Sequence, residues 1–333
     1  MNLVTVDPLD PDPEALSRAG EILRNGGLVA FPTETVYGLG ANALDQTAVT
    51  RIFDAKGRPA YNPLIVHVAD GAAAQRLTAA WPDVATVLAR KFWPGPLTLV
   101  LPKAATVPDI VTAGLPSVAL RVPAHPLAHA LLRAAGVPVA APSANRFTEL
   151  SPTTAAHVRK GLGDRVDVIL DGGPTNVGIE STVLDLTGDH PTLLRPGSIS
   201  ASEIESLIGP IGRAGDQPAE TARPAPGMLD RHYSPKAQLR LYPSGSAERI
   251  LSDHARETES GLRVGVILTT SATSATVLVR VLSREPDVYA RDLYATLHDL
   301  DELGCEAILV EAPPEQSAWD GVRDRLRRAA HQG

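Results

Sequence analysis

The sequence predicts an α/β protein of two domains, on three observations. The chain has 333 residues, more than one hydrophobic core commonly organises. Apolar strand-like and amphipathic helix-like segments intermix up to residue 208, which predicts a twisted mixed sheet with helices packed on it. Beyond residue 236 strands and helices alternate more regularly, which predicts a smaller, Rossmann-like α/β domain with a parallel sheet.

The elements of the first domain, residues 1–208, follow from apolar periodicity and capping residues. Pro13 suits the first turn of a helix that Gly26 stops, and Asp45 caps a helix that Gly57 ends. Strands are expected at 28–31, 64–68, 97–101, 117–122, 137–141, 166–170, 181–186 and 192–195. Further helices are expected near 83–92, 126–135, 153–161 and 201–208.

The segment 209–236 separates the two domains. It carries five prolines and four glycines without apolar periodicity, so we expect an extended linker. It also holds bulky residues that a simple spacer does not need, which predicts a lid over the site of the first domain. These residues are Met228, Leu229, His232 and Tyr233. The second domain, residues 237–333, is expected to have strands at 237–242, 263–269 and 306–310 and helices near 245–257, 288–300 and 315–330.

Composition narrows the function classes. A net charge of -7 and a pI near 5.7 argue against a broad basic face for nucleic acid, but not against a small basic pocket. The single cysteine, Cys305, lies beside an apolar run and is expected to be a buried core thiol. We find no N-terminal signal segment and no apolar run near ~20 residues, so we expect a cytoplasmic protein without a membrane partner.

A polar segment follows the first apolar strand, 28–31. This strand stops at Pro32, and a glycine-bearing loop with Thr35 follows, which is typical of a ligand site. Residues 38–43 match the G-x-G-x-x-A dinucleotide pattern in letters, but no helix begins directly after them, so we do not expect a nicotinamide site. The phosphate loop of P-loop enzymes is absent, so ATP would need another cradle.

Four cations lie near the ends of predicted elements. Lys56 and Arg58 end a helix, where a ligand role and simple complementation of the helix C-terminus both stay open. Arg121 lies in an apolar strand and Arg195 at the end of another. A buried arginine needs an anion, and for Arg121 a protein carboxylate and a ligand are both open.

Weaker signals surround these cations. His67 lies in the apolar run 64–68, where a core histidine is the simpler interpretation. Small residues precede Ser143 and Asn145, which permits close approach of a ligand but also fits a plain turn. Together, and without a metal cluster or a Ser-His-Asp spacing, these residues predict a pocket for a polyanion and a small polar molecule.

Several motifs resemble one family in their order. They are PTETVYGLG, KGRP with NPLIVHV, SVALRVP, APSAN, ESTVLDL and LLRPGSI. Through them the chain resembles the threonylcarbamoyl-AMP synthases, whose catalytic domain has the YrdC-like fold, a twisted α/β sheet with a large concave cavity. The sequence PGMLDRHYSP at 226–235 resembles the linker of the long, two-domain form. The resemblance implies a nucleotidyltransferase that converts L-threonine, bicarbonate or CO2 and ATP to L-threonylcarbamoyladenylate and pyrophosphate.

The same resemblance implies site residues. Threonine would be held by Thr35, His67, Arg121, Ala141 (through its backbone) and Ser181, with Arg121 facing the carboxylate. The nucleotide would be held by Lys56, Arg58, Asn62, Ser117, Ser143, Asn145, Ser151, Arg195 and Tyr233. Lys56 and Arg58 would be the catalytic cations, and Tyr233 would close the pocket. Mg2+ would arrive with the ATP phosphates rather than on protein ligands, and no organic cofactor is expected.

The resemblance also implies partners. A threonylcarbamoyl-transferase would move the product's acyl group to the adenosine beside the anticodon of tRNA, whereas direct tRNA binding by this chain stays open. Two alternatives remain. An RNA-binding module would bind without turnover, and a carbamoyl-adenylate-type transferase would carry extra catalytic domains or zinc-type clusters.

Overall fold

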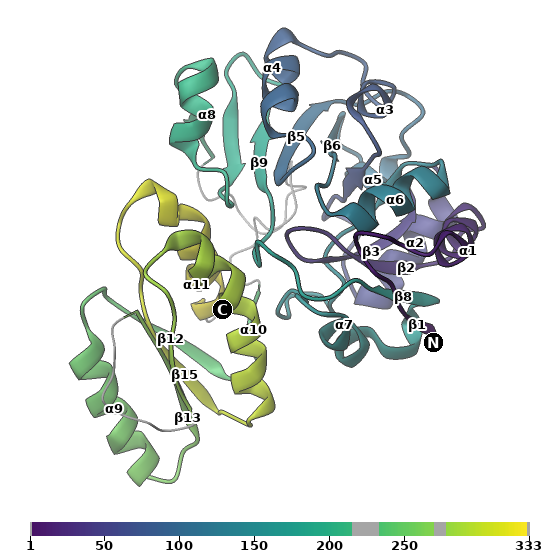
Figure 1. The fold of residues 1–333 in the computed structure, drawn as a ribbon. Coiled ribbons are helices and arrows are strands. Elements are labelled where there is room, and N and C mark those ends of the chain that lie inside the picture. Colours follow the sequence, from purple (N-terminus) through teal and green to yellow (C-terminus); the bar gives the residue numbers. More distant parts are fainter. Residues whose placement is uncertain (1, 215–232, 270–277, 332–333) are drawn as a thin grey trace.

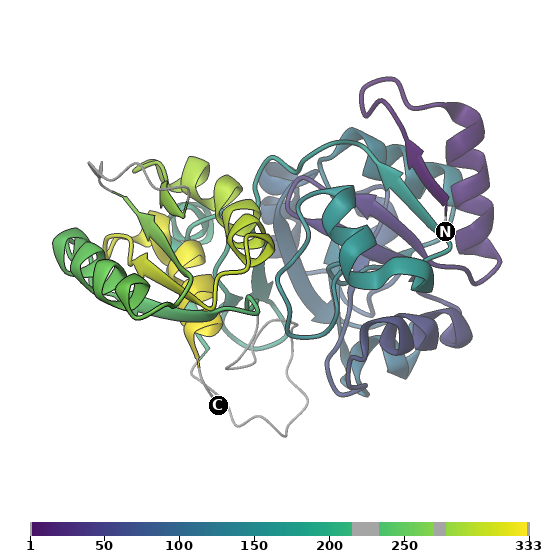
Figure 2. The same ribbon diagram turned by 90° about the horizontal axis from the view of Figure 1, so that it is seen from below.

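The computed structural model describes residues 2–214, 233–269 and 278–331, which fold around two sheets (Figure 1). Met228, Leu229 and His232 of the expected lid lie outside the described residues. Within the described ranges, no helix is long and apolar enough to cross a membrane. The two lobes lie side by side in both views (Figures 1 and 2).

The sheet of the first domain is mixed, as predicted. In spatial order its described strands are β1 (Asn2–Thr5), β8 (Val168–Asp171), β2 (Val29–Pro32), β3 (Tyr37–Asn42), β7 (Val139–Ala140), β4 (Ile65–His67), β6 (Ser117–Arg121), β5 (Leu97–Pro102), β9 (Thr182–Asp185), β10 (Thr192–Arg195) and β11 (Gly212–Arg213). β4 and β6 are parallel neighbours, and their register pairs His67 with Arg121. Strand pairing therefore brings these two predicted site residues together.

Helices cover this sheet unevenly. The helices are α1 (Pro13–Arg24), α2 (Gln46–Lys56), α3 (Gly71–Gln75), α4 (Asp83–Phe92), α5 (Asp109–Thr112), α6 (Pro126–Ala135), α7 (Ala155–Leu162) and α8 (Ala201–Ile208), with a 3-10 turn at Gly163–Arg165. On β2, Phe31 packs in a core with α1 and α6, whereas Ala30 packs with α2, α4, α7 and α8 on the opposite face. His67 and Arg121 lie on the same face of the sheet as Phe31, in a part that α1 and α6 do not cover.

The second domain has a parallel sheet, as predicted. Its described strands lie in the order β12 (Gln238–Tyr242), β15 (Ala307–Glu311), β13 (Val264–Leu268) and β14 (Val279–Val281). Its helices are α9 (Ala247–Glu259), α10 (Pro286–Glu302) and α11 (Asp320–Ala330), with a 3-10 turn at Ser317–Trp319. α9 covers the outer face of this sheet, and α10 and α11 face the first domain (Figure 1). Cys305 is buried, as predicted.

One expectation about the first domain was wrong. The segment Tyr37–Asn42, predicted as part of a glycine-bearing loop, is strand β3, and only residues 33–36 form a turn. Its glycines serve packing, because a Cβ on Gly40 would lie 2.8 Å from an atom of the Phe31 ring. The short elements β1, β11, β14, α3 and α5 were not predicted from the sequence either.

A hydrophobic cluster joins the two domains. Val36, Leu150 and Ile179 of the first domain are buried together with residues of α10 and α11, among them Tyr294 and Leu326. The backbones approach closely there, because a Cβ on Gly321 of α11 would lie 2.6 Å from the carbonyl oxygen of Gly197. The second domain is therefore packed directly against the part of the first domain that holds the site.

Candidate active site

A small cavity lies on the uncovered part of the first sheet. Its free volume is about 50 Å3, well below the roughly 300–1,000 Å3 of common small-molecule sites. It is lined by Thr33, Thr35, Val36, Gly38, Arg58, Ile65, His67, Arg121, Ala141, Pro142, Ser143, Glu180, Ser181, Arg195 and Tyr233. Three arginines thus share one cavity with hydroxyl groups and an imidazole, as expected for binding of an anionic ligand.

Arg121 answers the question that the sequence left open. It pairs with the protein carboxylate of Glu34, with 2.8 Å between Arg121 Nη2 and Glu34 Oε1. Arg121 Nη1 also donates to Thr35 Oγ1 (3.0 Å), and its Nε donates to the carbonyl of Gly95 (3.2 Å). Arg121 lines the cavity, whereas Glu34 is not among the lining residues, so a protein carboxylate outside the lining holds the guanidinium in a fixed orientation.

His67 is a neutral group at the cavity. Burial and the charge of Arg121 lower its pKa to about 3, and its ring packs edge-on against Phe31 with centroids 6.4 Å apart. Among the described residues its buried Nδ1 has no hydrogen-bond partner. His67 lines the cavity, and a buried polar atom without a protein partner can be satisfied by a ligand or by water, so both a binding role and a structural role stay open.

Arg58 and Lys56 differ in their surroundings. Arg58 lines the cavity and donates to the carbonyls of Asn62 (3.2 Å) and Pro63 (2.9 Å); burial chiefly lowers its pKa, to about 9. Lys56 does not line the cavity. Its Nζ donates to the carbonyls of Ser143 and Asn145, both at 2.5 Å, and burial lowers its pKa well below the ordinary value. Lys56 thus anchors the segment that presents Ser143 to the cavity.

Arg195, Ser181 and Tyr233 form the opposite wall. Arg195 donates to the carbonyl and the hydroxyl of Ser181, both at 3.1 Å, and its Nη1 lies 3.5 Å from the Tyr233 hydroxyl. Ser181 also shares a hydrogen bond with Thr98 (2.8 Å). Tyr233 is 1% exposed and has a φ of 59°, a left-handed conformation that is strained for a bulky residue. Tyr233, near the C-terminal end of the segment predicted as a lid, therefore forms part of this wall.

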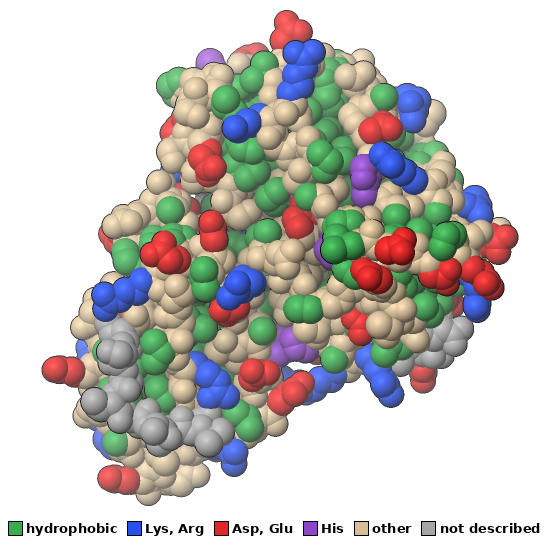
Figure 3. All heavy atoms as spheres, in the orientation of Figure 1, with side chains coloured by type: hydrophobic (Ala, Val, Ile, Leu, Met, Phe, Trp, Pro, Cys, Tyr) green, Lys and Arg blue, Asp and Glu red, His purple; other side chains and the backbone are tan. Residues whose placement is uncertain are grey.

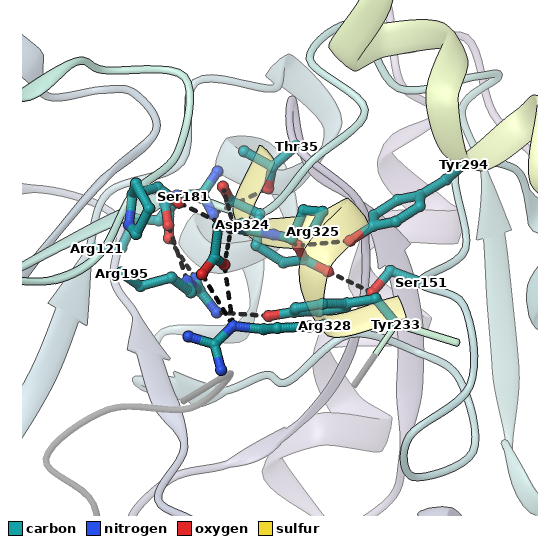
Figure 4. Close-up of polar contacts among 12 residues, drawn as sticks. Thr35, Arg121, Ser151, Ser181, Arg195, Tyr233, Tyr294, Asp324, Arg325 and Arg328 are labelled. Atoms are coloured by element: carbon teal, nitrogen blue, oxygen red, sulfur yellow. Dashed lines mark hydrogen bonds and ion pairs between the residues drawn. The ribbon is translucent and has the colours of Figure 1, made fainter. Parts of the chain in front are cut away.

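Glu180 is a cavity residue to which the sequence analysis gave no role. It accepts hydrogen bonds from the hydroxyls of Ser151 and Tyr294 and from Nε of Arg325 (2.7 Å). Burial acts to raise its pKa, but Arg325, Arg195 and the Ser151 hydroxyl outweigh burial, so the pKa is lowered. In Figure 4, Ser151, Tyr233, Tyr294 and Arg325 converge from different elements.

The structure brings most of the predicted site residues together. Those at the cavity are Thr35, Arg58, His67, Arg121, Ala141, Ser143, Ser181, Arg195 and Tyr233. Asn145 and Ser151 lie directly behind it, and Asn62 is buried beside Arg58. Ser117 begins β6, four residues or roughly 13 Å from Arg121 at about 3.3 Å per residue, and does not line this cavity.

Two further residues escaped the sequence analysis. Glu34 lies in the polar motif that follows the first apolar strand. A carboxylate at the end of such a strand could have been recognised as a site candidate from the sequence. Arg325 gave no signal, because α11 carries several arginines and resembles a solvated helix face. Among the described residues no group of three His, Cys, Asp or Glu side chains could hold a metal ion.

Charges on the molecular surface do not form one basic face in the view of Figure 3. Lys and Arg side chains are interspersed with Asp and Glu over both domains. A nucleic-acid surface commonly needs a continuous basic patch. On this face the charges therefore do not favour the RNA-binding alternative.

Fold and site together define an α/β enzyme with an enclosed basic pocket on a mixed sheet. A family model described as telomere recombination (Sua5, YciO and YrdC) matches residues 21–197, and one described as threonylcarbamoyl-AMP synthase, C-terminal domain, matches residues 199–331. The chain belongs to the threonylcarbamoyl-AMP synthase family, in its two-domain form.

Known proteins agree with this assignment over nearly the whole chain. Threonylcarbamoyl-AMP synthase of Pyrococcus abyssi is 45% identical over 318 residues, which cover 94% of this chain and 93% of the relative. The Bacillus subtilis enzyme of the same name is 44% identical, covering 97% and 95%. The crystal structure of P. abyssi Sua5 complexed with L-threonine matches with a TM-score of 0.94 and 42% identity, covering 99% of this chain and 98% of that one.

Proposed function

We propose that this chain joins L-threonine, bicarbonate or CO2 and ATP to L-threonylcarbamoyl-AMP with release of pyrophosphate. The observation that carries the proposal is the meeting of Arg58, Arg121 and Arg195 around one enclosed cavity. These cations suit a carboxylate and phosphates, and the family relatives are synthases of this name.

The threonine side is built on Arg121. Its guanidinium would face the amino-acid carboxylate, held in place by Glu34 and Thr35. Ser181 and the backbone of Ala141 would contact the remaining polar groups, and neutral His67 would offer a hydrogen bond without adding charge. The threonine amine must be neutral before it attacks CO2, and a neutral imidazole can accept a hydrogen bond from it without placing a further charge beside it.

The nucleotide side is built on Arg58 and Arg195. Both would contact phosphate oxygens, with Ser143 at the cavity and Asn145 just behind it, and Lys56 would hold that segment in position. Asn62, Ser117, Ser151 and Tyr233 complete the set proposed for ATP. The carboxylates Glu34 and Glu180 are already paired with arginines, so Mg2+ would enter with the phosphates as part of the substrate.

The chemistry requires enclosure. Bicarbonate supplies CO2 and hydroxide; the threonine amine adds to the CO2, and the hydroxide takes up the released proton to give carbamate and water. A carbamate oxygen then attacks the α-phosphorus of ATP. The bond from that phosphorus to the bridging oxygen breaks, and pyrophosphate leaves with the electron pair. Because carbamate and mixed anhydride are labile, positioning and exclusion of water supply much of the catalysis. The burial of Tyr233 fits such a lid.

The product would be used in the cytoplasm by a threonylcarbamoyl-transferase that acts on tRNA beside the anticodon. Direct tRNA binding by this chain is not part of the proposal.

The test is pyrophosphate release from Mg-ATP, measured with and without threonine and with and without bicarbonate. We expect release that requires both. Equal release without threonine would refute the synthase proposal and favour an ATPase or a carbamoyl-adenylate-type reaction, and RNA binding without any release would favour the RNA-binding alternative.

A further inference from the structure

Arg325 of α11 reaches from the second domain to two residues that line the active-site cavity, Glu180 and Tyr233. Its side chain is fully buried. Nε donates to Glu180 Oε2 (2.7 Å) and Nη2 to the Glu180 carbonyl (3.2 Å). Nη1 donates to the carbonyl of Pro196 (2.8 Å) and pairs with Asp324 (2.9 Å). One side chain of the second domain thus binds the first domain at two points beside the cavity.

The same guanidinium contacts the residue that covers the cavity. Arg325 Cζ lies 5.1 Å from the centroid of the Tyr233 ring, a cation–π distance. The Tyr294 ring lies 6.0 Å from that of Tyr233, and its hydroxyl donates to Glu180 Oε2 (3.2 Å). Glu180 and Tyr233, two lining residues, are therefore oriented by the same two residues of α10 and α11. Figure 4 shows Tyr233, Tyr294 and Arg325 close together.

A glycine sets how closely α11 approaches. Gly321 lies four residues before Arg325, so both are on one face of the helix. A Cβ on Gly321 would meet the backbone of Gly197 at 2.6 Å. Backbone cannot move aside as a flexible side chain can, so even alanine there would push α11, and Arg325 with it, away from the cavity.

We infer that Arg325 is a positioning residue for the synthase reaction: from the second domain it fixes the Glu180 carboxylate and the Tyr233 ring on the cavity wall. The inference deepens the proposed function and rests on it. Arg325 does not line the cavity, so its effect passes through these two neighbours.

Loss of Arg325 has a defined electrostatic consequence. Burial acts to raise the Glu180 pKa, and Arg325 is the foremost charge that opposes it. Without Arg325 the carboxylate takes up a proton at higher pH than in the wild type. Within the described ranges, the other charged or titratable groups that face Glu180 or Arg325 are Lys56, Arg195, Tyr233, Tyr294 and Asp324.

Three variants of the full chain test the inference. Arg325→Met removes the guanidinium group. We expect kcat/KM for threonine-dependent pyrophosphate release to fall by roughly 100-fold, the loss that is common when catalytic groups are misplaced. Gly321→Ala keeps the charge but displaces the helix, and should lower kcat/KM in the same direction. Arg323→Met is the matched control on α11, because Arg323 is ion-paired with exposed Glu315 and should stay within about twofold of wild type. Should Arg325→Met fail to fold, Arg325→Lys carries the test, with a smaller loss expected.

Two readouts separate positioning from a merely structural role. The kcat/KM of Arg325→Met should rise with pH relative to wild type, because Glu180 regains its charge. The double variant Arg325→Met/Glu180→Gln should regain thermal stability, since no unpaired carboxylate remains, but should not regain kcat/KM.

Wild-type kcat/KM in folded Arg325→Met, or full recovery of kcat/KM in the double variant, would overturn the inference. If the wild type releases no threonine-dependent pyrophosphate, the proposed function fails instead. Calorimetric titration of ATP into the same variants then distinguishes the two failures: unchanged affinity in Arg325→Met overturns the positioning of the cavity wall as well, whereas weakened affinity shows that Arg325 positions the wall although the synthase reaction is absent.

Discussion

The two domains contribute to the site through different parts of their structure. The first supplies a turn and strand ends, with Thr35, His67, Arg121 and Arg195. The second supplies the packed faces of α10 and α11, with Tyr294 and Arg325. Open parallel sheets commonly bind ligands at the carboxyl ends of their strands.

At the carboxyl end of β15 in the second domain, the carboxylate of Glu311 accepts hydrogen bonds from the backbone of Gly245 (2.9 Å) and Thr269 (2.8 Å). The sheet edge where a ligand is commonly bound holds an internal contact at this point, while the helix face contacts Glu180 at the candidate site of the first domain. Fold class therefore does not determine which surface of a domain is used.

The largest effect is expected from removing the second domain. A chain of residues 1–208 lacks Tyr233, Tyr294 and Arg325, and we expect synthesis to fall by roughly 100-fold or more, since water enters and the cavity wall loses its partners. Circular dichroism should show that the truncated domain is folded. Threonylcarbamoyladenylate synthesis at the full-length rate would mean that the second domain serves something other than the site.

Within the first domain, Arg58→Ala should be the most damaging single change. Loss of a desolvated contact to phosphate costs about 2–5 kcal/mol, which is about thirtyfold or more in kcat/KM. Lys56→Ala should also lose activity, but with a lower melting temperature, because two buried carbonyls lose their donor. Wild-type kinetics in both variants would show that these cations merely complement the end of α2.

Arg121→Leu should separate the two substrates. We expect the KM for threonine to rise more than that for ATP, because Arg121 would face the amino-acid carboxylate. Arg121→Leu/Glu34→Gln is the matched control, since it removes the carboxylate left without its partner. An equal rise in both KM values in the double variant would contradict the assignment.

Acid should weaken the contact between the domains. The rings of His157 in α7 and His298 in α10 stack with centroids 3.8 Å apart, and burial chiefly lowers both pKa values to about 4. The pKa of each histidine in the folded state lies below its value in the unfolded state, which is near 6.5. The neutral pair therefore makes its whole contribution to folding stability above about pH 6.5, and this contribution is lost as the pH falls towards about 4. His157→Phe keeps an aromatic ring but cannot take up a proton. On acidification, the melting temperature of this variant should fall by roughly 2–4 °C less than that of the wild type. Identical acid sensitivity in His157→Phe would exclude this pair as the cause.

The smallest effect is expected from a surface contact between the same domains. Lys160 and Glu302 pair at 2.9 Å, but both side chains are about half exposed, at 48% and 50%. Exposed pairs commonly contribute 0–1 kcal/mol, roughly, because water and salt screen them. A double-mutant cycle with Lys160→Ala and Glu302→Ala, read by thermal unfolding, should give a coupling below about 1 kcal/mol. A larger coupling would mean that domain docking depends on this exposed pair as well as on buried groups such as Arg325.

Local sequence signals were enough to predict much of the first domain. Apolar strands, capped helices and lone cations at strand ends are local signals, so Arg121 and Arg195 were recognisable as site candidates from their neighbours in the chain. The parallel sheet of the second domain followed likewise from regular alternation of strands and helices. Short strands such as β11 escaped because two residues carry too little periodicity to be read.

The partners of these groups became identifiable only once the chain was folded. Glu34 was not identified as the anion of Arg121, because the two are distant in the chain and meet only when the sheet forms. The role of α11 was equally hidden, since its arginines look alike in sequence. Packing through Gly321 buries Arg325 against Glu180 and leaves Arg327 exposed, because one face of a helix can contact the neighbouring domain while the other stays in water.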